Sequence, residues 1–248
     1  VATTNQLSAI APESPFTLGP ARLEGELRRA RGTTAIRADL DAQQIEALGQ
    51  SVRFSGPVEA ALTERRFSLN ADLHAQDRPP ALFAAGRLQT ELNYNRARGR
   101  FTLASAALTG DALDLNAQGW ANRGDGEFSG EWRVRRLDAL SPDLAGAASG
   151  RWRAFSERDG DAHVWIAAID GQGAQIGGAS ALVPQLLGAA PRLDARLRAE
   201  EGGLTLEHAR INGENLRAGA TGRIVQGEAN INLEASARGP LDVGGAQL

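Results

Sequence analysis

Polar and apolar residues alternate one by one in many short segments of this chain. In the segment 67–74 the odd positions are apolar and the even positions are polar. The segments 101–104, 113–118, 204–207 and 230–235 follow the same pattern. A period of two places successive side chains on opposite faces of a β-strand. We therefore expect strands with one polar and one apolar face, which are typical of antiparallel sheets.

Short glycine-containing segments separate the alternating ones. Glycine adopts the left-handed backbone conformations that tight turns need, and Asn and Asp tolerate them. The sequence therefore predicts an all-β meander of hairpins, with a few short helical turns. Alternation alone leaves two arrangements open, an open curved sheet that forms a groove and a closed β-sandwich. The predicted turns lie at 30–32, 97–99, 109–111, 123–126, 159–161, 201–203 and 212–214.

Three segments break the alternation. Residues 137–150 have the composition of a loop, whereas residues 180–187 and 40–49 could each form one or two helical turns. None of them is long enough for a helical layer. We expect one continuous segment over residues 1–248, with a candidate sub-boundary near 137–150. Because the chain begins at Val1 and contains no Met, we expect it to be a piece of a longer protein.

Part of the sequence is repeated. Residues 101–120 align without gaps on residues 204–223, and seven of the twenty positions are identical, among them Gly110 with Gly213. Six of those seven are Ala, Gly or Leu, so composition contributes to the score. The shared order of strand, turn and strand is the stronger signal, and it predicts a sheet that is extended by repeated hairpins.

Composition argues against several classes of function. The 27 basic residues, all Arg, are interspersed with 30 acidic ones, so there is no basic stripe for nucleic acid. Cysteine is absent, which excludes disulfides and thiolate metal sites. His74, His163 and His208 share no ligand spacing, and no pair of carboxylates suggests acid–base catalysis. We therefore predict a protein that is not an enzyme and needs no metal or cofactor.

Certain segments resemble a known family. The segment 182–222, LVPQLLGAAPRLDARLRAEEGGLTLEHARINGENLRAGATG, is similar to the repeats of TamB-like proteins, and the connector 138–150 is similar to one that recurs in them. Related AsmA-like lipid transfer proteins share the pattern. The resemblance implies an elongated, open β-groove in the periplasm. It further implies a parent protein that is anchored in the inner membrane and contacts a TamA-like barrel of the outer membrane through other parts.

The function implied by this resemblance is phospholipid transport between the two membranes, with a role in outer-membrane protein assembly. The alternatives are a β-augmentation scaffold for nascent outer-membrane proteins and a closed β-sandwich binding module. If lipid is the ligand, the apolar strand faces should hold its acyl chains. The predicted groove-facing, lipid-binding residues are Phe67, Leu69, Leu73, Phe101, Leu103, Leu113, Leu115, Leu204, Leu206, Ile231 and Leu233.

Overall fold

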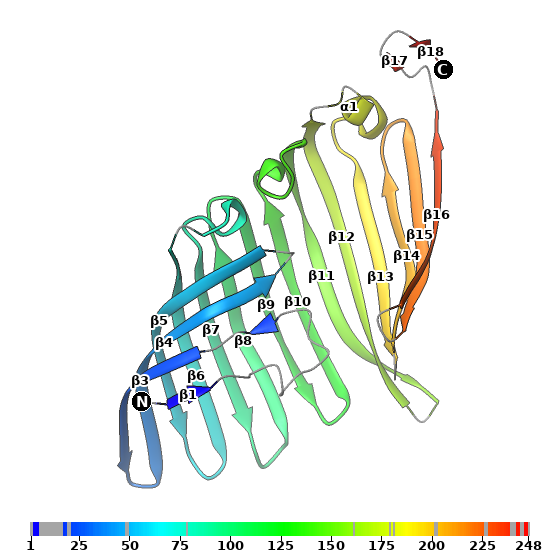
Figure 1. The fold of residues 1–248 in the computed structure, drawn as a ribbon. Coiled ribbons are helices and arrows are strands. Elements are labelled where there is room, and N and C mark those ends of the chain that lie inside the picture. Colours follow the sequence, from blue (N-terminus) through cyan, green and yellow to red (C-terminus); the bar gives the residue numbers. More distant parts are fainter. Residues whose placement is uncertain are drawn as a thin grey trace. The chain divides into compact units, whose positions relative to one another are not determined.

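Two compact units, Val1–Arg123 (unit 1) and Gly124–Leu248 (unit 2), make up the chain in this computed structural model. Antiparallel strands form both of them (Figure 1). The structure describes residues 2–4, 17–18, 21–47, 50–77, 79–160, 162–178, 180, 182–200, 203–225, 228–238, 242–243 and 246–247.

Unit 1 is a meander in which each strand from β3 to β9 pairs with its neighbour in sequence. Two short strands extend it, since β1 pairs with β3 and β2 pairs with β4. Its elements are β1 (Ala2–Thr4), β2 (Thr17–Leu18), β3 (Ala21–Ala30), β4 (Thr33–Ala47), β5 (Gln50–Leu62), β6 (Arg66–Gln76), the 3-10 turn η1 (Ala81–Phe83), β7 (Arg87–Asn95), β8 (Arg100–Thr109) and β9 (Leu113–Asn122).

Unit 2 repeats this arrangement, with sequence neighbours paired from β10 to β16. A separate two-stranded pair, β17 with β18, follows. Its elements are β10 (Asp125–Val134), the 3-10 turn η2 (Leu137–Ala139), β11 (Leu144–Asp159), β12 (Ala162–Gly178), α1 (Leu182–Leu187), β13 (Arg192–Glu200), β14 (Gly203–Asn212), β15 (Leu216–Val225), β16 (Glu228–Ala237), β17 (Asp242–Val243) and β18 (Ala246–Gln247).

The all-β, antiparallel prediction is confirmed. The strand order within each unit is linear and the sheet is open, so the closed β-sandwich alternative is wrong. None of the described helices is long and apolar enough to cross a membrane.

Two kinds of connection join the strands of unit 1. At one end, called the tight-turn end, the hairpin loops are short. In the β3–β4 loop both Arg31 and Gly32 have positive φ, 48° and 78°, as a type I′ hairpin turn requires. At the other end, called the connector end, the longer link between β6 and β7 contains η1. Its Leu82 and Phe83 are almost fully buried, which makes this end the core of unit 1.

The repeat seen in the sequence is also a structural repeat. Adding 103 to the bounds of β8 and β9 gives the bounds of β14 and β15. The irregularity between Leu103 and Ala106 recurs between Leu206 and Ala209. In each hairpin a turn N–H donates to the carbonyl of a preceding connector, from Asp111 to Ala84 at 2.9 Å and from Glu214 to Leu187 at 3.1 Å. These pairs are also 103 residues apart.

The three segments without alternation fold in different ways. Residues 182–187 form α1, so the helical prediction for 180–187 is confirmed there. The helical prediction for 40–49 is wrong as far as Ala47, because β4 continues to that residue; residues 48 and 49 lie outside the described residues. The loop prediction for 137–150 holds only for its first half, because β11 begins at Leu144. The candidate sub-boundary near 137–150 covers most of the link between β10 and β11 and the first part of β11, all within unit 2.

Candidate functional site

The pairing register of unit 1 assigns its side chains to two faces. Directly opposed residues of an antiparallel pair lie on the same face. Starting from Leu69 of β6, this rule leads to Ala60 of β5, to Leu92 of β7 and on to Leu103 of β8. The face traced in this way, called the apolar face of unit 1, carries no charged residue from β4 to β9.

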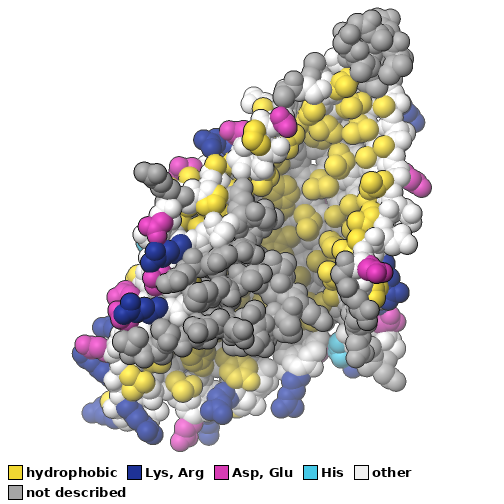
Figure 2. Space-filling model, viewed as in Figure 1, with side chains coloured by type: hydrophobic (Ala, Val, Ile, Leu, Met, Phe, Trp, Pro, Cys, Tyr) yellow, Lys and Arg dark blue, Asp and Glu magenta, His cyan; other side chains and the backbone are white. Residues whose placement is uncertain are grey.

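Unit 2 has an apolar face of the same kind. Leu206 of β14 is opposed by Leu197 of β13 and Gly222 of β15, and Gly222 is opposed by Ile231 of β16. The described residues on this face from β13 to β16 are all Leu, Ile, Ala or Gly. Figure 2 shows hydrophobic side chains gathered over these strands.

All of the predicted lipid-binding residues lie on these faces. The register places Phe67, Leu69, Leu73, Phe101, Leu103, Leu113 and Leu115 on the apolar face of unit 1. It places Leu204, Leu206, Ile231 and Leu233 on the apolar face of unit 2. That these residues bind lipid remains a prediction.

Burial divides the predicted residues into three groups. The half-buried ones are Phe67, Leu69, Phe101, Leu103, Leu115 and Leu206. Leu73 and Leu113 are buried and belong to the core at the connector end of unit 1, where no ligand reaches them. Leu204, Ile231 and Leu233 are exposed in unit 2, and the Leu233 side chain is 78% exposed. More of the predicted residues are therefore exposed to a ligand in unit 2 than in unit 1. The sequence pattern does not distinguish the two units in this respect.

Small side chains form the middle of the apolar face of unit 2. Ala195, Ala209 and Ala220 oppose one another on three neighbouring strands. The rows on either side carry larger residues, Leu193 with Ile211 and Leu197 with Leu206. These alanines form a strip of small side chains across β13, β14 and β15. Leu193 and Leu197 are missing from the predicted set, although their alternation with Asp194 and Arg196 carries the same sequence signal.

Aromatic side chains cover the glycine-rich part of the same face. Trp132 of β10 opposes Gly150, which in turn opposes Gly171 of β12. A Cβ atom on Gly171 would collide with the Trp132 ring, so this glycine lets the indole lie flat on the sheet. The Trp132 indole nitrogen is buried without a hydrogen-bond partner. Nearby, the Phe128 and Trp165 rings are tilted with centroids 6.0 Å apart.

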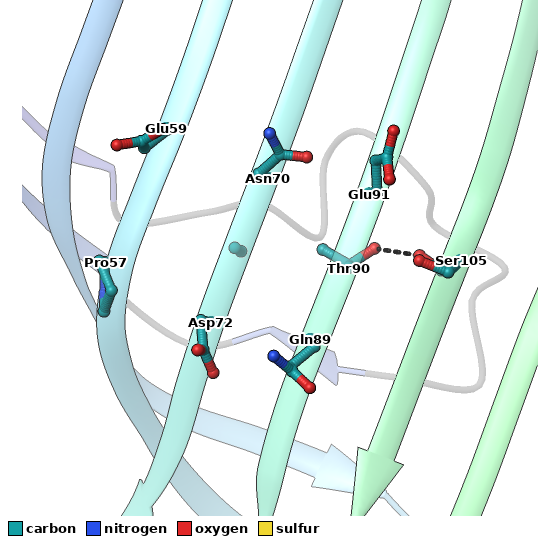
Figure 3. A pocket seen from close by; sticks show the side chains of 9 residues that line it. Pro57, Glu59, Asn70, Asp72, Gln89, Thr90, Glu91 and Ser105 are labelled. Atoms are coloured by element: carbon teal, nitrogen blue, oxygen red, sulfur yellow. Dashed lines mark hydrogen bonds between the residues drawn. The ribbon is translucent and has the colours of Figure 1, made fainter.

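Thr90 is one of the few polar residues on the apolar face of unit 1. Its hydroxyl donates to the Ser105 carbonyl oxygen at 3.4 Å (Figure 3). Ser105 lies at the irregularity between β8 and β9, where the ladder is interrupted. The hydroxyl is thus directed to the backbone and adds little polarity to the face.

The opposite face of each sheet is polar and rich in ion pairs. Arg87 contacts both carboxylate oxygens of Asp72 at 2.5 and 2.7 Å, and Arg53 binds Asp41 in the same two-pronged manner at 2.7 and 2.8 Å. The hydrogen bonds from these guanidinium groups, and then their charges, hold the pKa of Asp72 and of Asp41 below the ordinary range despite some desolvation. Both carboxylates are therefore ionised and engaged at neutral pH, which does not suit a general acid or base.

An open hollow on this polar face spans β5 to β8, with Glu59, Asn70, Asp72, Gln89 and Glu91 among its lining residues (Figure 3). Glu59 pairs with Arg37 at 2.9 Å and Asp72 with Arg87. Across the described part of the chain, no group of three His, Cys, Asp or Glu side chains is placed to hold a metal ion. Each histidine has a single carboxylate near it, His208 with Asp194 at 2.9 Å being the tightest pair. The apolar faces are therefore the better candidate site.

Comparisons with protein families, with curated proteins and with solved structures found no match for this chain.

Proposed function

We propose that the apolar faces hold the acyl chains of phospholipids. The chain would then be a periplasmic segment of a TamB-like protein that carries lipid between the inner and outer membranes and assists outer-membrane protein assembly. Its parent would be anchored in the inner membrane and reach a TamA-like barrel through other segments. One observation carries this proposal, namely an uncharged apolar face that is broadly exposed in unit 2.

Exposure of such a face to water is unfavourable. Soluble monomers rarely leave a contiguous apolar patch of more than a few hundred square ångströms uncovered unless it binds something. Leu204, Ile211, Ile224, Ile231 and Leu233 are all exposed large apolar residues of this one face. A ligand with long hydrocarbon chains would cover it without requiring a hydrogen-bond partner, and the face offers none from β13 to β16.

The free energy of acyl chain transfer explains why the face must be continuous. Exposing a methylene to water costs about 0.8 kcal/mol, so an ordinary acyl chain would face a barrier of roughly 12 kcal/mol in crossing water. An unpaired charge on the face would cost several kcal/mol to desolvate or would draw in water. An uninterrupted apolar surface removes most of this barrier.

The proposal is tested with two double variants of unit 2. Leu204→Asp with Leu206→Asp adds two charges to the apolar face, whereas Thr205→Asp with Thr221→Asp adds two to the polar face. Each chain is purified from cells, and bound phospholipid is measured by native mass spectrometry. We expect wild type and the threonine variant to retain lipid, and the leucine variant to lose at least about nine-tenths of it, because one buried charge outweighs several methylene contacts.

Circular dichroism and resistance to protease show whether both variants are folded. If the folded leucine variant retains as much lipid as wild type, the apolar face is not the binding surface. If wild type carries no lipid when purified and takes none from vesicles, the proposed function is wrong.

A second candidate is a scaffold for nascent outer-membrane strands, and the edge strand β16 favours it. β16 pairs with β15 on one side, and no described strand pairs with its other side. All ten of its residues are exposed. Such an edge offers free backbone groups to an incoming strand. Binding of an unfolded outer-membrane protein by lipid-free chain, without any lipid uptake, would favour this function over the first.

A further inference from the structure

The tight-turn end of unit 1 carries a cluster of arginines. Neighbouring turns bring together six of them, and the same turn segments contain two acidic residues, Glu64 and Asp125. The backbone N–H of Arg96 donates to the Arg65 carbonyl at 2.9 Å, so the loops of two successive hairpins are in direct contact. We call this cluster the basic rim; it consists of Arg65, Arg66, Arg96, Arg98, Arg100 and Arg123, all of them exposed.

The basic rim differs from the rest of the polar face in its lack of counter-charges. Several arginines elsewhere on unit 1 are paired, as in Arg37 with Glu59 and Arg87 with Asp72. Within the described ranges, none of the six rim arginines forms an ion pair with a carboxylate. Arg100 instead lies over the Trp120 ring, with its guanidinium carbon 4.5 Å from the ring centroid. Like charges held in adjacent turns repel one another, so an anion would be attracted to this rim.

An open hollow lies within the basic rim. Arg66, Arg98 and Arg100 line it together with Asn93 and Asn95. Guanidinium groups donate hydrogen bonds in pairs to phosphate oxygens, and amide groups add further donors. A Cβ atom on Gly99 would lie 3.5 Å from the Arg123 side chain, which places a further guanidinium beside the same loop.

Aromatic residues lie next to the basic rim on the other face of the sheet. Phe67, Tyr94 and Phe101 oppose one another on β6, β7 and β8, at the tight-turn ends of these strands. Leu62 and Ala121 extend this row on either side. Tyr and Trp gather where a membrane changes from hydrocarbon to headgroup, because one part of the ring is apolar and another is polar. Phe67 and Tyr94 also line the hollow.

We propose that the basic rim binds the phosphate of an anionic phospholipid whose acyl chains pass over the tight-turn edge of the sheet onto the apolar face of unit 1. The aromatic row would then mark the boundary between headgroup and chain. This inference rests on the proposed function and adds a preference for lipids with net negative charge, such as phosphatidylglycerol. In Figure 2 basic side chains line the lower edge of unit 1, beside hydrophobic ones.

The repeat shows that the basic rim is not a general property of the hairpins. Positions 96, 98 and 100 of unit 1 correspond to 199, 201 and 203 of unit 2 at the 103-residue step, where the sequence has Ala, Glu and Gly. The Arg198 that precedes them is paired with Asp159. We therefore expect the headgroup preference to reside in unit 1 alone.

The test compares lipid uptake from two kinds of vesicle, pure phosphatidylcholine and an equal mixture of phosphatidylcholine with phosphatidylglycerol. The rim variant is Arg66→Ser, Arg98→Ser and Arg100→Ser. The control, Arg22→Ser, Arg37→Ser and Arg151→Ser, removes the same charge from paired arginines elsewhere. We expect wild type and control to prefer the mixed vesicles and the rim variant to bind them about a hundredfold more weakly, since each basic residue near an anionic surface contributes roughly fivefold.

Separate outcomes distinguish this inference from the proposed function. Equal uptake of both lipids by wild type would overturn the headgroup preference while leaving acyl binding intact, whereas uptake of neither would overturn both. An equal loss in the rim variant and the control would show a general charge effect.

Full competition by millimolar inorganic phosphate would assign the hollow to free phosphate instead. If the rim variant does not fold, the wild-type preference must still vanish at about 1 M salt, where the screening length falls to about 3 Å; a salt-insensitive preference would overturn the inference.

Discussion

At the scale of single residues, the ion pairs of the polar face make the stability of the folded chain depend on pH. A carboxylate whose pKa is lowered by folding contributes stability above its unfolded pKa, about 4 for aspartate. This contribution is lost as the pH falls through the lower, folded pKa. Asp72, paired with Arg87, and Asp41, paired with Arg53, are such groups. We therefore expect the urea midpoint of wild type to fall as the solution is acidified below about pH 4.

Variants of the Asp72 pair test this expectation. Asp72→Asn and Arg87→Gln should each lower the urea midpoint at pH 7 and make its decline in acid shallower, because each removes the interaction that lowers the pKa. In the double variant, the urea midpoint should fall with acid at least as steeply as in either single variant. If the urea midpoint of both single variants depends on pH as steeply as that of wild type, other carboxylates control acid unfolding.

At the scale of elements, the contact between connector and hairpin turn gives a prediction from a matched pair of glycines. Gly213 and Gly110 occupy equivalent turns of the repeat. A Cβ atom on Gly213 would lie 2.6 Å from the Leu186 carbonyl oxygen in α1, whereas one on Gly110 would lie 3.0 Å from that of Ala84. Backbone atoms yield poorly to such crowding, so Gly213→Ala should cost about 1–3 kcal/mol and displace α1.

Gly110→Ala is the control, since its closest contact is tight but less severe. Unfolding in urea gives the difference in stability between the two variants. Hydrogen exchange of the Glu214 amide, which bonds to Leu187 at 3.1 Å, reports the contact itself. Equal losses of stability in the two variants, with unchanged exchange at Glu214, would show that the connector does not depend on this turn.

The sequence predicts strands and their faces well because alternation records both directly. It fails where a local irregularity disturbs the period. In β4 the register shifts between Ala42 and Ile45, and an inserted residue turns the strict alternation into a spacing that resembles a helix. Residues 144–150 escape detection for another reason, because their Ala, Gly and Ser side chains give no contrast between two faces. The same lack of contrast hides the strip of Ala195, Ala209 and Ala220.

Exposure is the part of the candidate site that the sequence does not predict. Leu73 and Leu233 occupy equally clear alternating segments, yet Leu73 is 5% exposed and Leu233 is 78% exposed. The difference comes from the strands and connectors that surround each residue, which pattern alone does not specify. The basic rim likewise arises because successive turns stack at one end of the sheet, although the local cluster of arginines at 96–100 is visible in the sequence.

At the scale of the whole molecule, the open edge and the open face together predict self-association when ligand is removed. Ile231 and Leu233 are exposed on β16, and an exposed apolar edge strand invites pairing with another chain. We expect the delipidated chain to form oligomers and to return to monomer when phospholipid is added back. Size-exclusion chromatography with light scattering measures this change.

Lysines on β16 test how much this edge strand contributes to association. Ile231→Lys with Leu233→Lys should suppress oligomers of the delipidated chain, because lysines on an edge strand oppose pairing between strands. Arg217→Lys with Arg223→Lys, which keeps the charge of neighbouring β15, serves as the control and should associate as wild type does. Persistent oligomers in the β16 variant would point to contact through the rest of the apolar face.

Each strand from β3 to β9, and from β10 to β16, pairs with its neighbour in sequence, and this has a consequence for the size of such proteins. Neighbouring strands lie about 4.8 Å apart, so each added hairpin lengthens the sheet by roughly 10 Å without altering the register of any other. A gene that duplicates the 103-residue step would thus extend its product in fixed increments. The width of a sheet of this design is therefore proportional to the number of its hairpins, and the shape of each hairpin need not change.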